Sequence, residues 1–115
     1  MDLCKNGGFS LCLKKMDFHL LYLVATLLTS VTDNAALTFL GSQVEGLSDI
    51  AKYYLVAGSI VGGGLTLIAN APNAIGYSKL KKFFPEGFNP LFLFLGSLAP
   101  TLITFCIFAI YFAIQ

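Results

Sequence analysis

Charged residues are scarce in this 115-residue chain: they make up 11% of it, whereas 57% of the residues are hydrophobic. A soluble domain carries about 25% charged residues, because its surface faces water. This chain has too few polar side chains to cover a water-soluble globule of its size. The deficit argues against an ordinary soluble domain and predicts an all-α integral membrane protein, a multi-pass protein of the cell membrane.

Several functional classes are disfavoured by what is missing. With a net charge of +1, the chain lacks the excess of Lys and Arg that is typical of nucleic-acid-binding proteins. Cys4, Cys12 and Cys106 form no C-x-x-C pair and are expected to be free thiols, with no metal or disulfide framework. His19 is the only histidine, it begins an apolar segment, and it has no nucleophile at catalytic spacing. We therefore expect His19 at the membrane interface, and a protein that is neither an enzyme nor a holder of a resident cofactor.

The few charges are also segregated along the chain. Residues 53–78 and 87–115 contain none. A bilayer core about 30 Å thick is crossed by about 20 apolar helical residues, and both stretches are longer than that. Each stretch is therefore predicted to contribute a membrane segment.

The membrane domain is assigned to residues 16–115, behind an N-terminal tail at 1–15. Three apolar segments divide this domain, and the last of them, residues 90–114, is expected to be an ordinary spanning helix with a kink at Pro100.

The first apolar segment, residues 18–44, has Thr32, Asp33 and Asn34 in its middle. An Asp at the centre of a membrane helix costs about 2.5–3.5 kcal/mol on insertion scales, so a buried Asp33 is expected to be functional. The alternative is an ordinary helix N-cap in a surface loop. Neither arm of the segment is long enough to cross a bilayer alone. The segment is therefore either a re-entrant helical hairpin or one spanning helix.

The second segment, residues 53–78, contains three glycines at 62–64 and a later proline, Pro72. Pro72 removes a backbone donor and disfavours helical geometry at Ala71. We therefore expect a discontinuous transmembrane helix: a first part to about Ala69, an unwound stretch, and a half-helix to about Leu80.

Asn70 and Asn73 flank this predicted break, and Thr66 lies one turn before it. Backbone groups freed at membrane depth must lie inside protein or beside water. Freed carbonyls with Asn and Thr oxygens are suitable ligands for a hard cation such as sodium. The alternative is a simple proline kink whose asparagines bond to their own backbone.

The two interruptions together indicate a secondary transporter more strongly than either does alone. Secondary transporters bind substrate and ions near the midplane, where discontinuous helices meet. A single carboxylate, Asp33, could hold sodium or a proton but not both. This competition would exchange the two ions without a nucleotide.

The stretches SVTDNAALTFLG (30–41) and GGGLTLIANAPNAIG (62–76) resemble the C-terminal repeat of the ion transporter superfamily, and most closely its sodium/proton antiporter family. The resemblance implies two inverted repeats, each with a re-entrant hairpin and a broken helix that bind cations where tip and break meet. Dicarboxylate carriers of this superfamily have a Ser-Asn-Thr tip, whereas Asp33 here would repel a carboxylate. The residues expected to bind ions are Thr32, Asp33 and Asn34 at the tip and Thr66, Asn70 and Asn73 at the break, with Pro72 as the helix breaker.

The chain has room for one hairpin and two helices, so we expect a fragment or one part of a transporter. The expected partners are lipid, sodium, protons and either the missing half or another copy. Two alternatives remain: a sodium-coupled carrier of a dicarboxylate or oxyanion, and a non-transporting small membrane protein. In the latter, Gly58 and the glycines at 62–64 would pack against a partner helix.

The lysines predict the topology incompletely. Lys79, Lys81 and Lys82 place the loop after the second segment in the cytoplasm. A hairpin at 18–44 then leaves Lys14 and Lys15 outside, whereas a single crossing would place them inside. The charge rule favours the crossing, and the resemblance and Asp33 favour the hairpin, which we adopt.

Overall fold

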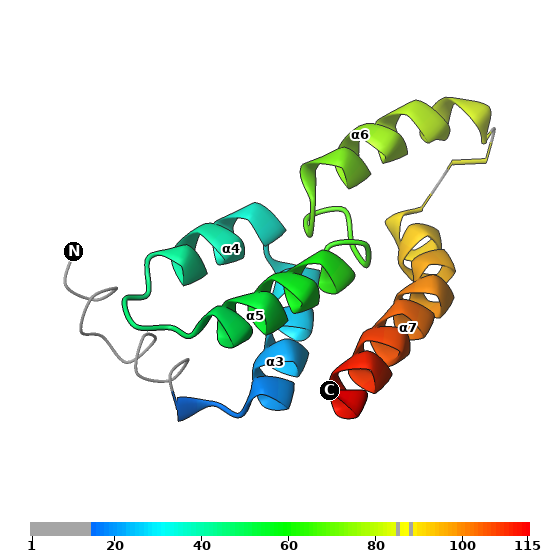
Figure 1. Ribbon diagram of the computed structural model, residues 1–115. Coiled ribbons are helices and arrows are strands. Elements are labelled where there is room, and N and C mark those ends of the chain that lie inside the picture. The colour runs from blue at the N-terminus through cyan, green and yellow to red at the C-terminus, as the bar shows by residue number, and fades with distance from the viewer. Residues whose placement is uncertain (1–14, 85, 88) are drawn as a thin grey trace.

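The computed structural model describes residues 15–84, 86–87 and 89–115, and all regular structure in these residues is helical. Most of the predicted tail, including Cys4, Cys12 and Lys14, lies outside the described residues. The elements in chain order are α3 (Phe18–Val31), α4 (Asn34–Ser42), α5 (Asp49–Gly62), α6 (Ala71–Leu80), the 3-10 turn η1 (Lys81–Phe83) and α7 (Pro90–Ile114). Figure 1 shows α3, α4 and α5 packed together, α6 projecting from them, and α7 beside α5.

The first apolar segment is two helices. Thr32 and Asp33 are both extended, with φ and ψ of −131° and 166° at Thr32 and −69° and 131° at Asp33. The chain changes direction there, so α4 does not continue the axis of α3 (Figure 1). The alternative of one straight helix over residues 18–44 is therefore wrong.

Helices α3 and α5 pack closely because two glycines of α5 face the backbone of α3. A Cβ added at Gly58 would lie 2.6 Å from the Tyr22 carbonyl oxygen, and one at Gly62 would overlap the Thr26 carbonyl oxygen and lie 3.1 Å from the Thr29 Cβ. These two glycines were predicted to pack against a partner helix if the protein did not transport. They are instead covered by α3 of the same chain.

The buried hydroxyls at this contact are satisfied locally. Thr26, Thr29 and Ser59 each donate to the carbonyl oxygen four residues earlier, at 2.9, 2.6 and 2.8 Å. They therefore stabilise their own helices and leave no unpaired polar atom in the contact between α3 and α5.

The second segment breaks earlier than predicted. Helix α5 ends at Gly62, not near Ala69, because successive glycines lower helix stability by about 0.8–1 kcal/mol each. Pro72 does not break a helix, and Ala71 is helical: they are the first residues of α6, where a missing N–H costs nothing. Asn70, with φ −158° and ψ 136°, is the extended residue before α6. The expected end at Leu80 is confirmed.

The third segment has the predicted bounds: α7 runs from Pro90 to Ile114, with Pro100 inside it. The Asn89 side chain accepts a hydrogen bond from the Leu91 amide at 3.0 Å and caps its start. Among the described residues, α7 alone is long and apolar enough to cross a membrane. The second segment does not supply another such helix, because the break divides it into helices of 14 and 10 residues.

Aromatic side chains attach α7 to the rest of the chain. Phe112 is buried and stacks on Tyr54 with ring centroids 3.9 Å apart, and Phe105 stacks on Tyr22 at 4.9 Å. The Tyr22 hydroxyl donates to the Phe105 carbonyl oxygen at 3.2 Å. These contacts place α7 against α3 and α5, and Cys106 on its exposed side carries a free thiol.

Candidate functional site

Four helix ends meet at one place in the structure: the C-terminal ends of α3 and α5 and the N-terminal ends of α4 and α6 (Figure 1). Two hydrogen bonds join the interruptions. The Thr66 hydroxyl donates to the Ser30 carbonyl oxygen at 2.6 Å, and the Asn34 amide donates to the Ala69 carbonyl oxygen at 3.0 Å. We call this region the tip–break junction, comprising residues 30–34 and 63–73.

The Asn73 side chain holds the unwound stretch of the junction together. Its amide nitrogen donates to the carbonyl oxygens of Gly63 and Thr66, at 2.8 and 2.7 Å. The Ser97 hydroxyl of α7 is shared between the carbonyl oxygen of Leu65 in this stretch, at 3.1 Å, and that of Phe94 in its own helix, at 2.9 Å. Asn73 is therefore bonded to backbone of its own segment, as the proline-kink alternative expected, while it also shapes the carbonyl-rich side of the junction.

Asp33 is the N-cap of α4. Its carboxylate accepts a hydrogen bond from the Ala36 amide at 3.3 Å, and the residue is exposed in this chain. The capping alternative for Asp33 is thus observed, because its carboxylate caps α4.

The other predicted ion ligands are divided between the two sides of the junction. The Thr32 hydroxyl donates to the Leu28 carbonyl oxygen at 2.7 Å and stays on its own helix. Asn34 faces the break, since a Cβ added at Gly63 would lie 3.0 Å from its side-chain nitrogen. Asn70 precedes α6 without a side-chain capping bond. The structure therefore brings Asn34, Thr66 and Asn73 to the junction, with Thr32 and Asp33 at its exposed edge.

The charges of the helix ends give the junction mixed polarity. Helix N-termini carry partial positive charge and C-termini partial negative charge, each about half an elementary charge. The Asp33 carboxylate adds a full negative charge. The described residues contain no cluster of three or more His, Cys, Asp or Glu side chains that could hold a metal. A cation bound here would therefore use carbonyl, amide and hydroxyl oxygens with one carboxylate, a set that suits a hard ion.

Comparison with known proteins places the chain in a family. The model of a family described as "Putative Na+/H+ antiporter" matches residues 9–111. The chain belongs to this family. No curated protein and no solved structure matches it. Membership of this family points to a membrane ion transporter.

Two contacts of the junction were not anticipated from the sequence. Ala69 is completely buried and supplies the carbonyl that binds the tip, but an alanine has no chemical signature that would single it out. Ser97 lies in the third segment, which was expected to be an ordinary spanning helix. The signal that could have found Ser97 is the set of small hydroxyl residues, Ser97, Thr101 and Thr104, in an otherwise largely apolar, uncharged helix.

Proposed function

We propose that this chain forms the ion-binding part of a secondary transporter that exchanges sodium for protons. In this proposal α3 and α4 form a re-entrant hairpin, and α5 and α6 are the two halves of a discontinuous membrane helix. The observation that carries the proposal is the pair of hydrogen bonds from Thr66 to Ser30 and from Asn34 to Ala69. Membership of the antiporter family supports the same assignment.

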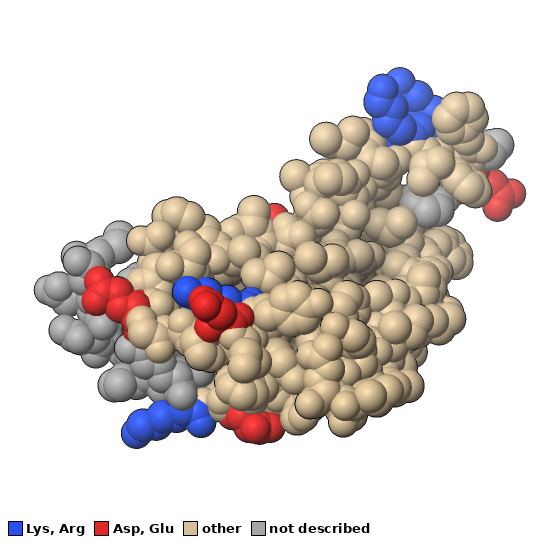
Figure 2. Space-filling view, viewed as in Figure 1, with Lys and Arg blue, Asp and Glu red and all other residues tan. Residues whose placement is uncertain are grey.

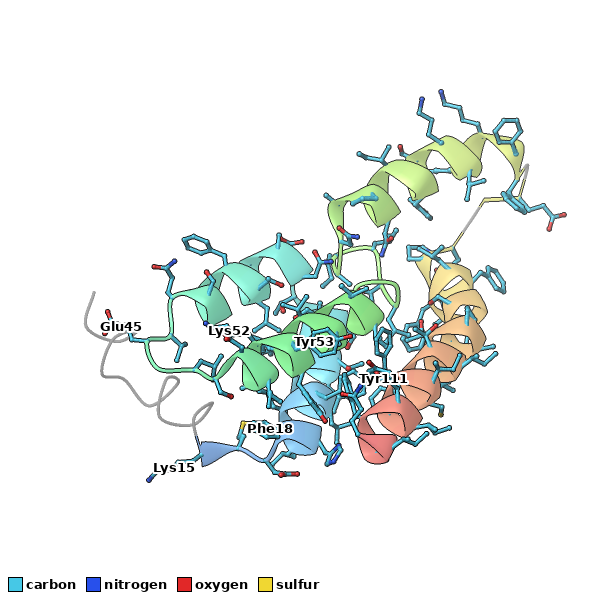
Figure 3. The ribbon with its side chains drawn as sticks, viewed as in Figure 1. Lys15, Phe18, Glu45, Lys52, Tyr53 and Tyr111 are labelled. Atoms are coloured by element: carbon cyan, nitrogen blue, oxygen red, sulfur yellow. The ribbon has the colours of Figure 1, made fainter. Side chains whose placement is uncertain are left out.

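The positions of charged and aromatic side chains support re-entry of the hairpin. Lys15 before α3, Phe18 at its start, Glu45 after α4 and Lys52 in α5 lie toward one end of the molecule (Figure 3). The lysines that follow α6 lie at the opposite end (Figure 2). A hairpin whose two ends share a side enters and leaves the bilayer there, with its tip between the two boundaries.

The proposed chemistry is competition for one carboxylate. Asp33 binds either a sodium ion or a proton, and the oxygens of Thr32, Asn34, Thr66, Asn70 and Asn73 complete the sodium site. Exchange follows because loading one ion requires release of the other.

The proposed site needs a cover from outside this chain. The molecule is 16 Å across in its thinnest dimension, and Asp33 lies at an exposed edge of the junction. Large apolar side chains next to it are also exposed, such as Val31 at 60% and Ile68 at 65%. Another repeat or another copy would bury this face and close the site, which is why we propose that the chain works within an assembly.

The experiment is sodium-driven proton movement in vesicles that contain the complete assembly, with an internal pH dye. Asp33→Asn retains a side-chain oxygen for the Ala36 amide and removes the charge, so the fold is kept and exchange is abolished. Asp49→Asn is the matched control, because Asp49 pairs with Lys52 at 3.3 Å on the surface. Normal exchange by Asp33→Asn would remove Asp33 from the mechanism.

A further inference from the structure

The segment after the broken helix gathers cations and apolar side chains at one end of the molecule. Lys79 lies in the last turn of α6, Lys81 and Lys82 lie in η1, and all three are exposed. Leu80 and Phe83 beside them are 45% and 78% exposed. We call Lys79–Phe83, written 79–83, the basic–aromatic end. Figure 2 shows its lysines as a blue group on the projecting end of the molecule, apart from the other lysines.

Within the described part of the chain, no salt bridge involves these lysines. Its one salt bridge joins Lys52 to Asp49 at the opposite end. The nearest acidic residue in sequence is Glu86, and the flanking stretches, residues 53–78 and 87–115, carry no charge. Helix α6 has no buried residue, so no core holds the basic–aromatic end in place.

The basic–aromatic end lies next to the start of the membrane-spanning helix. The Phe84 amide donates to the Lys81 carbonyl oxygen at 3.4 Å, and the Gly87 amide donates to the Phe84 carbonyl oxygen at 3.1 Å. Gly87 adopts a positive φ of 85°, which suits a tight reversal of the chain before α7 begins at Pro90. These turns lead from η1 to the N-terminal end of α7. The lysines are therefore separated by only a short stretch from the point where α7 would meet the membrane boundary.

Ammonium groups at a membrane boundary, with an exposed phenyl ring and leucine among them, match the chemistry of an anionic phospholipid. The headgroup phosphate attracts the lysines, whose long stems reach the boundary, and the ring inserts among the acyl chains. The positive-inside tendency places this end at the cytoplasmic leaflet, where anionic lipids are found. We propose that residues 79–83 form a binding surface for anionic phospholipid that anchors α6 to the cytoplasmic leaflet.

This proposal depends on membrane insertion and not on sodium/proton exchange, so it is tested by lipid binding alone. The complete protein is placed in nanodiscs that contain phosphatidylglycerol and phosphatidylcholine, and the enrichment of phosphatidylglycerol in the bound lipid is measured. Each lysine near an anionic surface contributes about a fivefold preference, so the triple variant K79Q/K81Q/K82Q is expected to lose on the order of 100-fold in relative affinity. The preference of the unmodified protein should also weaken at high salt.

Two variants control for folding and for general charge. K79R/K81R/K82R keeps the cations and should bind phosphatidylglycerol as the unmodified protein does. K15Q/K52Q removes two lysines from the opposite end and should leave the preference unchanged. Equal enrichment by the triple Gln variant, or an equal loss in K15Q/K52Q, would overturn the proposal. So would complete displacement of the lipid by excess inorganic phosphate, since the site would then recognise a free anion and not a membrane.

Discussion

Replacement of the glycines that face α3 tests the packing on which the tip–break junction rests. A Cβ at Gly62 would overlap the Thr26 carbonyl oxygen and lie 3.0 Å from the Thr26 carbonyl carbon. A Cβ at Gly58 would lie 2.6 Å from the Tyr22 carbonyl oxygen. These neighbours are backbone atoms of a helix, so they cannot turn aside as the end of a side chain would.

Gly58→Ala and Gly62→Ala must therefore push α3 and α5 apart. Overpacking of this kind costs about 1–3 kcal/mol, which corresponds to a melting temperature lowered by about 5 °C or more for a chain of this size. The matched controls are Gly76→Ala in α6 and Gly96→Ala in α7, where an added Cβ meets nothing within 4 Å. Alanine there removes a helix penalty of about 0.8–1 kcal/mol and should not lower stability.

Melting temperatures of the purified protein in detergent, measured by loss of the monodisperse peak after heating, separate the two pairs. If Gly62→Ala melted at the same temperature as the unmodified protein, the close contact between α3 and α5 would be wrong. If Gly96→Ala lost as much stability as Gly62→Ala, the effect would belong to glycine in general and not to this contact.

Two further variants test the hydrogen bonds of the junction with the same melting assay. Asn73→Ala removes the donor to the carbonyl oxygens of Gly63 and Thr66 and should lower the free energy of unfolding by about 1–3 kcal/mol. Asn70→Ala removes a side chain without a capping bond and should lower it less. Equal losses of stability in the two variants would contradict the role of Asn73. Thr66→Val removes the 2.6 Å hydrogen bond to the Ser30 carbonyl oxygen and should lower both stability and ion exchange. Thr66→Ser keeps the hydroxyl and should preserve both. A fully active Thr66→Val would show that this hydrogen bond is dispensable.

Local sequence rules predict helix boundaries correctly where contacts with residues distant in the sequence contribute little. The bounds of α7 follow from an uninterrupted apolar run between Asn89, which caps it, and the end of the chain. The interruption at Asp33 follows from a polar residue with cap chemistry in an apolar segment. These features depend on a few adjacent residues and on the cost of placing polar groups in lipid.

The same rules misplaced the break in the second segment. A proline is as compatible with the first turn of a helix as with a break, and Pro72 lies in the first turn of α6, whereas the glycines at 62–64 mark the end of α5. Whether α5 ends at Gly62 depends on α3, since this close approach requires glycine and the residues that follow bond to the tip instead of extending the helix. Such long-range partners are not visible in a single sequence.

The glycines of α5 illustrate a related limit. Small residues on a helix face indicate a close neighbour but do not say which helix it is. Here the neighbour of Gly58 and Gly62 is α3 of the same chain. The apolar side chains of Val31 and Ile68 remain exposed in this chain.

The most direct test of the account is equilibrium sodium binding to the purified complete assembly across a range of pH. If sodium and protons compete for Asp33, the apparent sodium affinity falls as the pH is lowered, each bound sodium releases protons, and Asp33→Asn abolishes both effects. Sodium binding that does not change with pH, or that Asp33→Asn retains with the same pH dependence, would contradict the proposal that this carboxylate is the exchange site.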